Sequence, residues 1–298
     1  MKKSVKTVVM AIDEPGSICL KQAIELGFNV VLLLTRFVNS NDFIQPCVIA
    51  EINKIPVEFP SSLNDIKIIK RIGDLRPDII ISSWFHLKIP KAIIETARLA
   101  AVNFHPSLLP KYRSATPIEW AIMNGETHTG LTCHLLEEKF DTGQILWQKQ
   151  IKIAANETTK ELSKRIALLS RDGFKDILLR VRTNNFIGAK QLDEDASYYP
   201  KRSEKDAIID WNNPASKIHN QIRAMNPRPI ARTYVDGEPV FIYRSLQTKM
   251  KHKQIPGSVI KCFSKNELLI ACGKSETLHL KEIVTSKKLY DLSSLNFN

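Results

Sequence analysis

The sequence predicts an α/β fold in which a mostly parallel, Rossmann-like sheet is flanked by helices and followed by a small β-barrel domain. The first observation is an apolar strand pattern at residues 7–12, a helical pattern at 18–26 closed by Gly27, and a second apolar strand at 29–34. Together these form the β-α-β unit that is typical of parallel sheets. The second observation is the continuous β-branched run at 78–84, which is expected of a central strand buried on both faces. The third is a series of short strands toward the carboxyl terminus, which favours a small barrel.

The other elements of the first part follow from the same hydrophobic patterns and from capping residues. Asp13-Glu14-Pro15-Gly16 predicts a turn between the first strand and the first helix. Further helices are expected at residues 46–54, at 61–72 with a serine cap from Ser61-Ser62, at 89–97, at 116–122 with Thr116 as the cap and Pro117 in the first turn, and at 157–179. Further strands are expected at residues 55–57, 101–105, 129–136 and 144–151.

The second part begins after a stretch in which the periodic pattern fades. Residues 183–205 are polar and aromatic, which predicts a linker that crosses the surface. A helix at 214–225 follows, and the turn pairs Asp236-Gly237, Pro256-Gly257 and Cys272-Gly273 separate the short strands. We therefore expect a first domain at residues 1–190, a linker at 191–206 and a second domain at 207–298.

Composition indicates a soluble protein of a reducing compartment. Hydrophobic residues make up 43% of the 298 residues, which is enough for a substantial core. The five cysteines lack the spacing of a disulfide framework or a metal site, and no apolar run is long enough for a signal peptide or a membrane span. We expect a cytoplasmic protein without a metal and without a membrane partner. The net charge of +12, with 17 Lys and Arg against 9 Asp and Glu in residues 201–298, fits a nucleic acid or a phosphorylated substrate, although dispersed lysines can also be a solvated face.

The residues that carry chemistry are Asn103, His105 and Asp141. Asn103 and His105 lie two apart on an expected strand, so their side chains project to the same side. An amide and an imidazole could donate hydrogen bonds to a developing oxyanion, and a carboxylate could remove a proton from an attacking amine, which is what acyl transfer to an amine requires. No GxSxG motif occurs and no cysteine adjoins these residues, which favours direct transfer over a covalent intermediate. The alternative is that the three are ordinary turn and cap residues.

The motif around them resembles a known family. Residues 103–113, Asn-Phe-His-Pro-Ser-Leu-Leu-Pro-Lys-Tyr-Arg, followed by Asp141-Thr142-Gly143, closely resemble the 10-formyltetrahydrofolate-dependent formyltransferases. The resemblance implies that Asn103 and His105 stabilise the tetrahedral oxyanion and that Asp141 accepts the proton. It also implies that residues 1–190 form the formyltransferase catalytic domain and that residues 207–298 form an OB-like domain.

The resemblance further implies where the two substrates lie. The folate would contact the segments that contain Trp84, Phe85, His86, Leu87, Glu138 and Phe140. An apolar strand end with Trp and Phe is a credible wall for a flat heteroaromatic ring, although aromatic residues there can equally belong to the core. The loop expected on the side of the acceptor comprises Ser107, Leu108, Leu109, Pro110, Tyr112 and Arg113.

The carboxyl-terminal extension reduces the number of candidate acceptor substrates. Ile209-Asp210-Trp211 and residues 256–260 resemble methionyl-tRNA formyltransferases and aminoarabinose formyltransferases, and they disfavour the single-domain glycinamide ribonucleotide formyltransferases. The loop at 35–46 is short and has Arg36 as its one basic residue, whereas the tRNA enzymes have a longer basic loop there. Segments 197–203, 214–220 and 268–273 also look more like the sugar enzymes. The first expectation is therefore formyl transfer to a nucleotide-linked amino sugar.

Two alternatives stay open. His105-Pro106-Ser107 resembles the tRNA enzymes, and the basic second domain could bind RNA phosphates, so Met-tRNA is the alternative acceptor. Ser114 stands where the family normally has glycine, and serine would cost about 1 kcal/mol if that position requires positive φ. The other alternative is a non-catalytic binding protein on the same fold.

Overall fold

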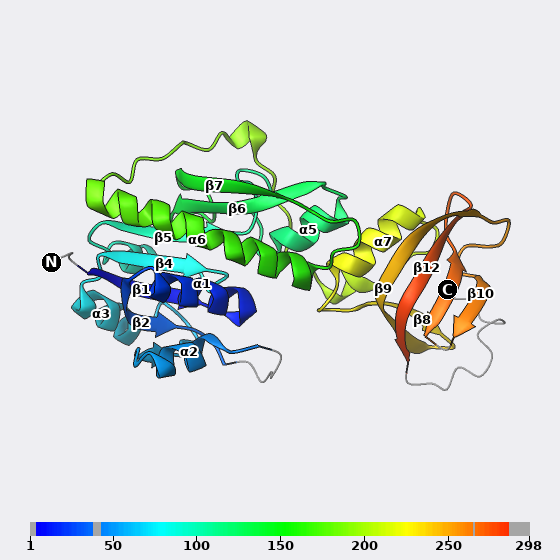
Figure 1. Cartoon of the computed structure of the whole chain (residues 1–298), viewed down its shortest axis with the longest axis horizontal. Coiled ribbons are helices and arrows are strands. Elements are labelled where there is room, and N and C mark those ends of the chain that lie inside the picture. The colour runs from blue at the N-terminus through cyan, green and yellow to red at the C-terminus, as the bar shows by residue number, and fades with distance from the viewer. Residues whose placement is uncertain (1–3, 38–42, 265, 286–298) are drawn as a thin grey trace. The chain divides into compact units, whose positions relative to one another are not determined.

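The computed structural model describes residues 4–37, 43–264 and 266–285, and these form two compact units (Figure 1). The first unit consists of residues 1–115, 129–151 and 163–199, and the second consists of residues 116–128, 152–162 and 200–298. The predicted division at 190 and 206 stays a prediction. No helix of the described chain is long and apolar enough to span a membrane.

The first unit is built on a seven-stranded sheet with the order β3-β2-β1-β4-β5-β6-β7. The pairs β3–β2, β2–β1, β1–β4 and β4–β5 are parallel, and β6 runs antiparallel to β5. The predicted mostly parallel sheet is therefore confirmed. The strands are β1 (Val5–Ala11), β2 (Phe28–Leu34), β3 (Val57–Glu58), β4 (Ile79–Ser83), β5 (Ala100–His105), β6 (His128–Leu135) and β7 (Ile145–Lys152).

Helices cover both faces of this sheet, and its central strands β1, β4 and β5 are almost entirely buried. All five residues of β4 are buried. Helices α3 and α4 pack on the face that carries Met10 and Ile80. On the other face, Phe174 of α6 packs against Phe104 of β5, with ring centroids 4.7 Å apart. The helices are α1 (Asp13–Glu25), α2 (Pro46–Ile52), α3 (Ile66–Leu75), α4 (Lys91–Ile94), α5 (Pro117–Met123) and α6 (Thr159–Thr183).

Three local predictions for these helices were wrong. The expected turn at residues 13–16 is the first turn of α1, because acidic residues and proline are compatible with a helix start. Helix α3 begins at Ile66 rather than near Ser61, since the Asp65 side chain caps it by accepting a hydrogen bond of 2.9 Å from the Lys67 N–H. Helix α4 is limited to Lys91–Ile94, shorter than the expected 89–97.

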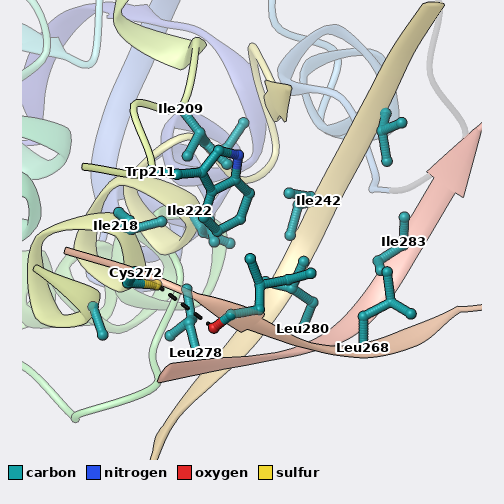
Figure 2. Packing of buried hydrophobic residues seen from close by; sticks show 14 of the residues in the cluster. Ile209, Trp211, Ile218, Ile222, Ile242, Leu268, Cys272, Leu278, Leu280 and Ile283 are labelled. Carbon is teal, nitrogen blue, oxygen red and sulfur yellow. Dashed lines mark hydrogen bonds between the residues drawn. The ribbon is translucent and has the colours of Figure 1, made fainter. Parts of the chain in front are cut away.

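The second unit contains a five-stranded antiparallel sheet with the order β10-β11-β12-β9-β8, as expected of a small carboxyl-terminal β domain. Asp236 and Gly237, both at positive φ, form the predicted tight turn between β8 and β9. Figure 2 shows the core, in which Trp211 and Ile222 face Ile242 and Leu280. The elements are α7 (Ala215–Ala224), β8 (Ala231–Val235), β9 (Glu238–Lys251), β10 (Val259–Ser264), β11 (Glu267–Ala271) and β12 (Glu276–Thr285).

The expected linker has structure of its own. Residues 193–195 and 204–207 form short 3-10 helices, η1 (Asp193–Asp195) and η2 (Glu204–Ala207). Up to Tyr199 the segment belongs to the first unit, and from Pro200 it belongs to the second.

Candidate active site

The predicted trio meets where β5 ends and the β6–β7 loop begins. Asn103 and His105 lie on β5, and the antiparallel register pairs Asn103 with His134 and His105 with Thr132 on β6. Directly opposed residues project to the same face, so His134 joins Asn103 and His105. Asp141 follows in the loop that connects β6 to β7. The structure thus brings the three predicted residues together and adds a fourth.

One carboxylate oxygen is the centre of this cluster. Asp141 Oδ1 lies 3.4 Å from His105 Nδ1, 3.5 Å from His134 Nε2 and 3.5 Å from Asn103 Nδ2. Asn103 Nδ2 is also 3.2 Å from His134 Nε2. We call Asn103, His105, His134 and Asp141 the Asp141 cluster. Both histidines are buried, at 4% and 1% exposure, so the cluster is largely shielded from water.

Backbone carbonyls determine which nitrogen of each histidine carries hydrogen. His105 Nε2 lies 3.0 Å from the Tyr112 carbonyl, and His134 Nδ1 lies 2.7 Å from the Leu135 carbonyl. A carbonyl can only accept, so these nitrogens are the donors. In the neutral rings, the nitrogens that face Asp141 therefore carry lone pairs. Asp141 Oδ1, His105 Nδ1 and His134 Nε2 are therefore three acceptors that face one another. A proton that enters the cluster can form hydrogen bonds with all three.

The electrostatic environment keeps the Asp141 cluster ready to accept that proton. Burial lowers the pKa of His105, and the opposing effect of the neighbouring Asp141 does not reverse the shift. Burial raises the pKa of Asp141, but the neighbouring His105, His134 and Arg113 outweigh it, so the Asp141 pKa lies below its ordinary value. Near neutral pH the carboxylate is charged and His105 is neutral.

Three segments around the cluster contain a bulky or charged residue in the left-handed region. Trp84 has φ of 55°, Tyr112 has φ of 61° and Asp141 has φ of 58°. For a residue with a side chain this conformation costs roughly 1–2 kcal/mol, and such outliers concentrate at functional sites. The turn after Asp141 is also sterically tight, because a Cβ at Gly143 would lie 1.9 Å from the Leu135 carbonyl oxygen. The backbone after Asp141 therefore fits only with glycine.

The predicted acceptor loop is tightly held. The Thr132 hydroxyl donates to the Ser107 carbonyl at 2.6 Å and accepts from the Leu109 N–H at 3.2 Å, and Gln148 donates to the Leu109 carbonyl at 2.9 Å. Ser107, Leu109, Tyr112 and Arg113 are buried, and Leu108 and Pro110 are partly exposed. The buried members thus hold the loop in shape, and direct contact with an acceptor stays a prediction.

Ser114 adopts no positive φ, unlike ten other non-glycine residues of the described chain. The serine that replaces the usual glycine therefore adds no backbone strain here.

The predicted folate residues divide into two groups. Phe85 and Leu87 are partly buried and pack against the core cluster of the sheet, and Trp84 is also partly buried. His86, Glu138 and Phe140 are exposed, and Lys88 Nζ lies 5.8 Å from the centre of the Phe140 ring. An exposed aromatic ring directly before Asp141, together with an apolar strand end, fits a flat heteroaromatic ligand. Within the described residues, no group of His, Cys, Asp and Glu side chains is arranged to hold a metal ion.

His134 was not predicted from the sequence. The strand at 129–136 was expected, but only the β5–β6 register places His134 opposite Asn103. A histidine within an expected strand, seven residues before Asp141, was the available signal.

Comparison with known proteins gives matches over both parts of the chain. Residues 41–178 match the formyl transferase family and residues 201–296 match the formyl transferase, C-terminal domain family. The bifunctional polymyxin resistance protein ArnA of Wigglesworthia glossinidia brevipalpis is 34% identical over 91% of the chain, which spans 41% of that protein's length. The methionyl-tRNA formyltransferase of Caldanaerobacter subterraneus subsp. tengcongensis is 32% identical over 94% of the chain and 92% of its own length.

Solved structures share the fold. HypX from Aquifex aeolicus in complex with tetrahydrofolic acid has a TM-score of 0.68 at 16% identity, over 96% of the chain and 45% of HypX. The sugar 3N-formyl transferase WlaRD, solved in the presence of dTDP and 5-N-formyl-THF, has a TM-score of 0.67 at 21% identity, over 93% of the chain and 97% of WlaRD.

Proposed function

The chain belongs to the formyltransferase family and is a folate-dependent formyltransferase, and we propose that it transfers the formyl group of 10-formyltetrahydrofolate to the primary amine of a nucleotide-linked amino sugar. The observation that carries the proposal is the Asp141 cluster, in which one buried carboxylate oxygen faces an amide and two imidazoles at 3.4–3.5 Å. We further propose that no metal takes part.

Each member of the Asp141 cluster has a part in direct acyl transfer. The folate donor supplies the formyl carbon. Asn103 Nδ2 donates one N–H to His134, and its other N–H, on the side of Asp141, can stabilise the oxyanion formed when the amine attacks. Asp141 is ionised and takes the proton that the amine loses as its new C–N bond forms. His105 shares this proton through Nδ1, and when protonated there it becomes the second donor to the oxyanion and can return the proton to the leaving nitrogen as the old C–N bond breaks.

His134 completes this arrangement by orienting Asn103. Its Nδ1 is held by the Leu135 carbonyl, so its Nε2 can only accept, and it does so from Asn103 Nδ2 at 3.2 Å. The amide nitrogen of Asn103, rather than its oxygen, is thereby turned toward the reacting groups. Donor positions fixed before the reaction are what make such a site effective.

The choice of acceptor is supported by structural neighbours and by the state of Arg36. The neighbours include a sugar 3N-formyl transferase and an N-formyltransferase in complex with dTDP-3-aminofucose. Arg36 Nη2 is engaged with Asp13 at 2.6 Å, so the one basic residue of the loop at 35–46 already has an anionic partner. Residues 38–42 of this loop lie outside the described chain. A loop with so little free positive charge fits a small acceptor better than an RNA backbone.

Met-tRNA is the second candidate acceptor. It is favoured by the match to methionyl-tRNA formyltransferases over more than nine-tenths of their length, and by the excess of basic residues in residues 201–298. A non-catalytic role is disfavoured because all three predicted catalytic side chains are present and meet.

One assay decides between the acceptors. Purified protein and 10-formyltetrahydrofolate are incubated in parallel with initiator Met-tRNA and with a set of nucleotide-linked amino sugars, and formylated product is measured by mass spectrometry. We expect formylation of an amino sugar with a kcat/KM at least tenfold higher than that for Met-tRNA. Preferential formylation of Met-tRNA would overturn the choice of acceptor, and no transfer to any amine would overturn the proposed function.

A further inference from the structure

We propose that residues 191–199, the first part of the linker expected at 191–206, form a clasp that positions His105 and Asp141, with Gln191 as the positioning residue for Asp141. This inference rests on the proposed function, because it assigns a role relative to that reaction. The clasp contacts the backbone on either side of the Asp141 cluster and provides none of the reacting groups.

Gln191 is a buried side chain whose hydrogen-bonding capacity is fully used. Its amide nitrogen donates to the carbonyls of Asp141 and Gly143, both at 2.8 Å. Its carbonyl oxygen accepts from Arg113 Nε at 3.2 Å and from Arg113 Nη2 at 2.9 Å. A guanidinium only donates and a backbone carbonyl only accepts, so chemistry fixes the orientation of the amide. At 6% exposure, water cannot substitute for these bonds without rearrangement.

These bonds hold the turn that presents Asp141. The turn begins with a left-handed aspartate at φ of 58° and ends at Gly143, which leaves no room for a side chain. Gln191 donates hydrogen bonds to both ends of the turn, at the backbone carbonyls of Asp141 and Gly143. Without these two donors, the turn could relax toward an ordinary conformation and withdraw Asp141 from His105.

The other end of the clasp holds the partner of His105. The Tyr112 N–H donates to the Ser197 hydroxyl and the Arg113 N–H donates to the Ser197 carbonyl, both at 2.9 Å. The Tyr199 ring stacks on Tyr112 with centroids 5.1 Å apart and an interplanar angle of 13°. Tyr112 then accepts the His105 Nε2–H at 3.0 Å. One segment therefore holds Asp141 directly, through Gln191, and holds His105 through Tyr112.

The arrangement has a measurable electrostatic consequence. His105 is faced by Asp141 and by His134, and Asp141 is also influenced by Arg113. Asp141 raises the pKa of His105 against the lowering effect of burial. If the turn that carries Asp141 moves away from His105, Asp141 raises the pKa of His105 less, and His105 titrates at a lower pH than in the wild type.

The test uses Gln191→Leu, with Gln22→Leu as the matched control. Gln22 is likewise buried, at 7% exposure, and bonds to Leu168 and Ser170 of α6 rather than to the site. The His105 titration is followed by NMR on histidine-labelled protein, and kcat and the donor KM are measured with the accepted amine. We expect Gln191→Leu to lower the His105 midpoint and to lower kcat about 10- to 100-fold with the donor KM within twofold. Gln22→Leu should change neither quantity.

Gln191→Glu serves if the leucine variant does not fold. It keeps a carboxylate acceptor for Arg113 but removes both donors to the turn, so it isolates the contact with Asp141 and Gly143. A folded Gln191 variant with wild-type kcat and an unchanged His105 titration would overturn the inference while the formyl transfer of the wild type still stands. If the wild type transferred no formyl group, the proposed function would be refuted. The role of Gln191 in positioning Asp141 would still be tested, because the NMR titration of His105 does not depend on turnover.

Discussion

Replacing Asp141 by asparagine should separate the chemistry of the cluster from its packing. The amide is nearly isosteric with the carboxylate, and its N–H groups can donate to the lone pairs of His105 and His134, which lie 3.4 and 3.5 Å from Oδ1. The variant thus keeps the contacts with both histidines, loses the one with Asn103 Nδ2, and can no longer accept a proton. Loss of a positioned general base typically lowers a rate by roughly 10²–10⁴, which corresponds to about 2.7–5.4 kcal/mol of barrier. We expect a fall in turnover within that range.

Stability should change far less than turnover. Charged hydrogen bonds are worth about 1.5–3 kcal/mol and neutral ones about 0.5–1.5 kcal/mol, so exchanging the carboxylate for an amide should cost about 1 kcal/mol. Single-turnover formylation at saturating donor gives the rate, and urea denaturation gives the free energy of unfolding. Asp172→Asn, an exposed aspartate of the same unit paired with Lys149, is the matched control and should leave the rate unchanged. An Asp141→Asn protein that folds normally and retains near wild-type turnover would refute the assignment of Asp141 as the base.

The other predictions concern the rest of the cluster and its loop. His105→Ala and Asn103→Ala should each lower kcat by roughly 10²–10³ with the donor Kd largely unchanged, and near-normal turnover would exclude an oxyanion role. His134→Ala should lower kcat about tenfold by releasing Asn103, and an unaffected rate would show that Asn103 is held by other contacts. Gly143→Ala, which would place a Cβ 1.9 Å from a carbonyl oxygen, should lower the free energy of unfolding by about 1–3 kcal/mol in urea denaturation, and an unchanged midpoint would mean that the turn adapts freely. Because the folded state lowers the pKa of His105, the unfolded chain binds its proton first; stability should fall as pH drops below about 6.5, and the fall should be smaller in His105→Ala. An identical pH dependence in both proteins would contradict the shift.

The sequence predicted the features that depend on local pattern. The continuous apolar run of β4 and the alternation that puts Asn103 and His105 on one side are both present, and the fold class is confirmed. The roles of the trio stay predictions, although the three side chains do meet.

The features that were not predicted from the sequence depend on contacts between segments that are distant in the chain. His134 joins the site through the pairing register of β5 with β6, which no local pattern specifies. Gln191 lies in a polar stretch without periodicity, and its importance comes from partners 48, 50 and 78 positions away. The start of α1 was not predicted because proline and glycine, as at Pro15 and Gly16, are common in turns. Proline is also common in the first turn of a helix, which is where Pro15 lies.

The interleaving of the two compact units determines how related enzymes can be recombined. The second unit includes residues 116–128 and 152–162 as well as the carboxyl-terminal part. Within it, α5 packs on α7, and Met123 of α5 lies against the core that includes Trp211. A chimera that exchanged only residues 207–298 would join unmatched halves of one hydrophobic core. An exchange that also carried residues 116–128 and 152–162 would transplant that core intact, so the second unit can be exchanged between related enzymes only as a discontinuous block.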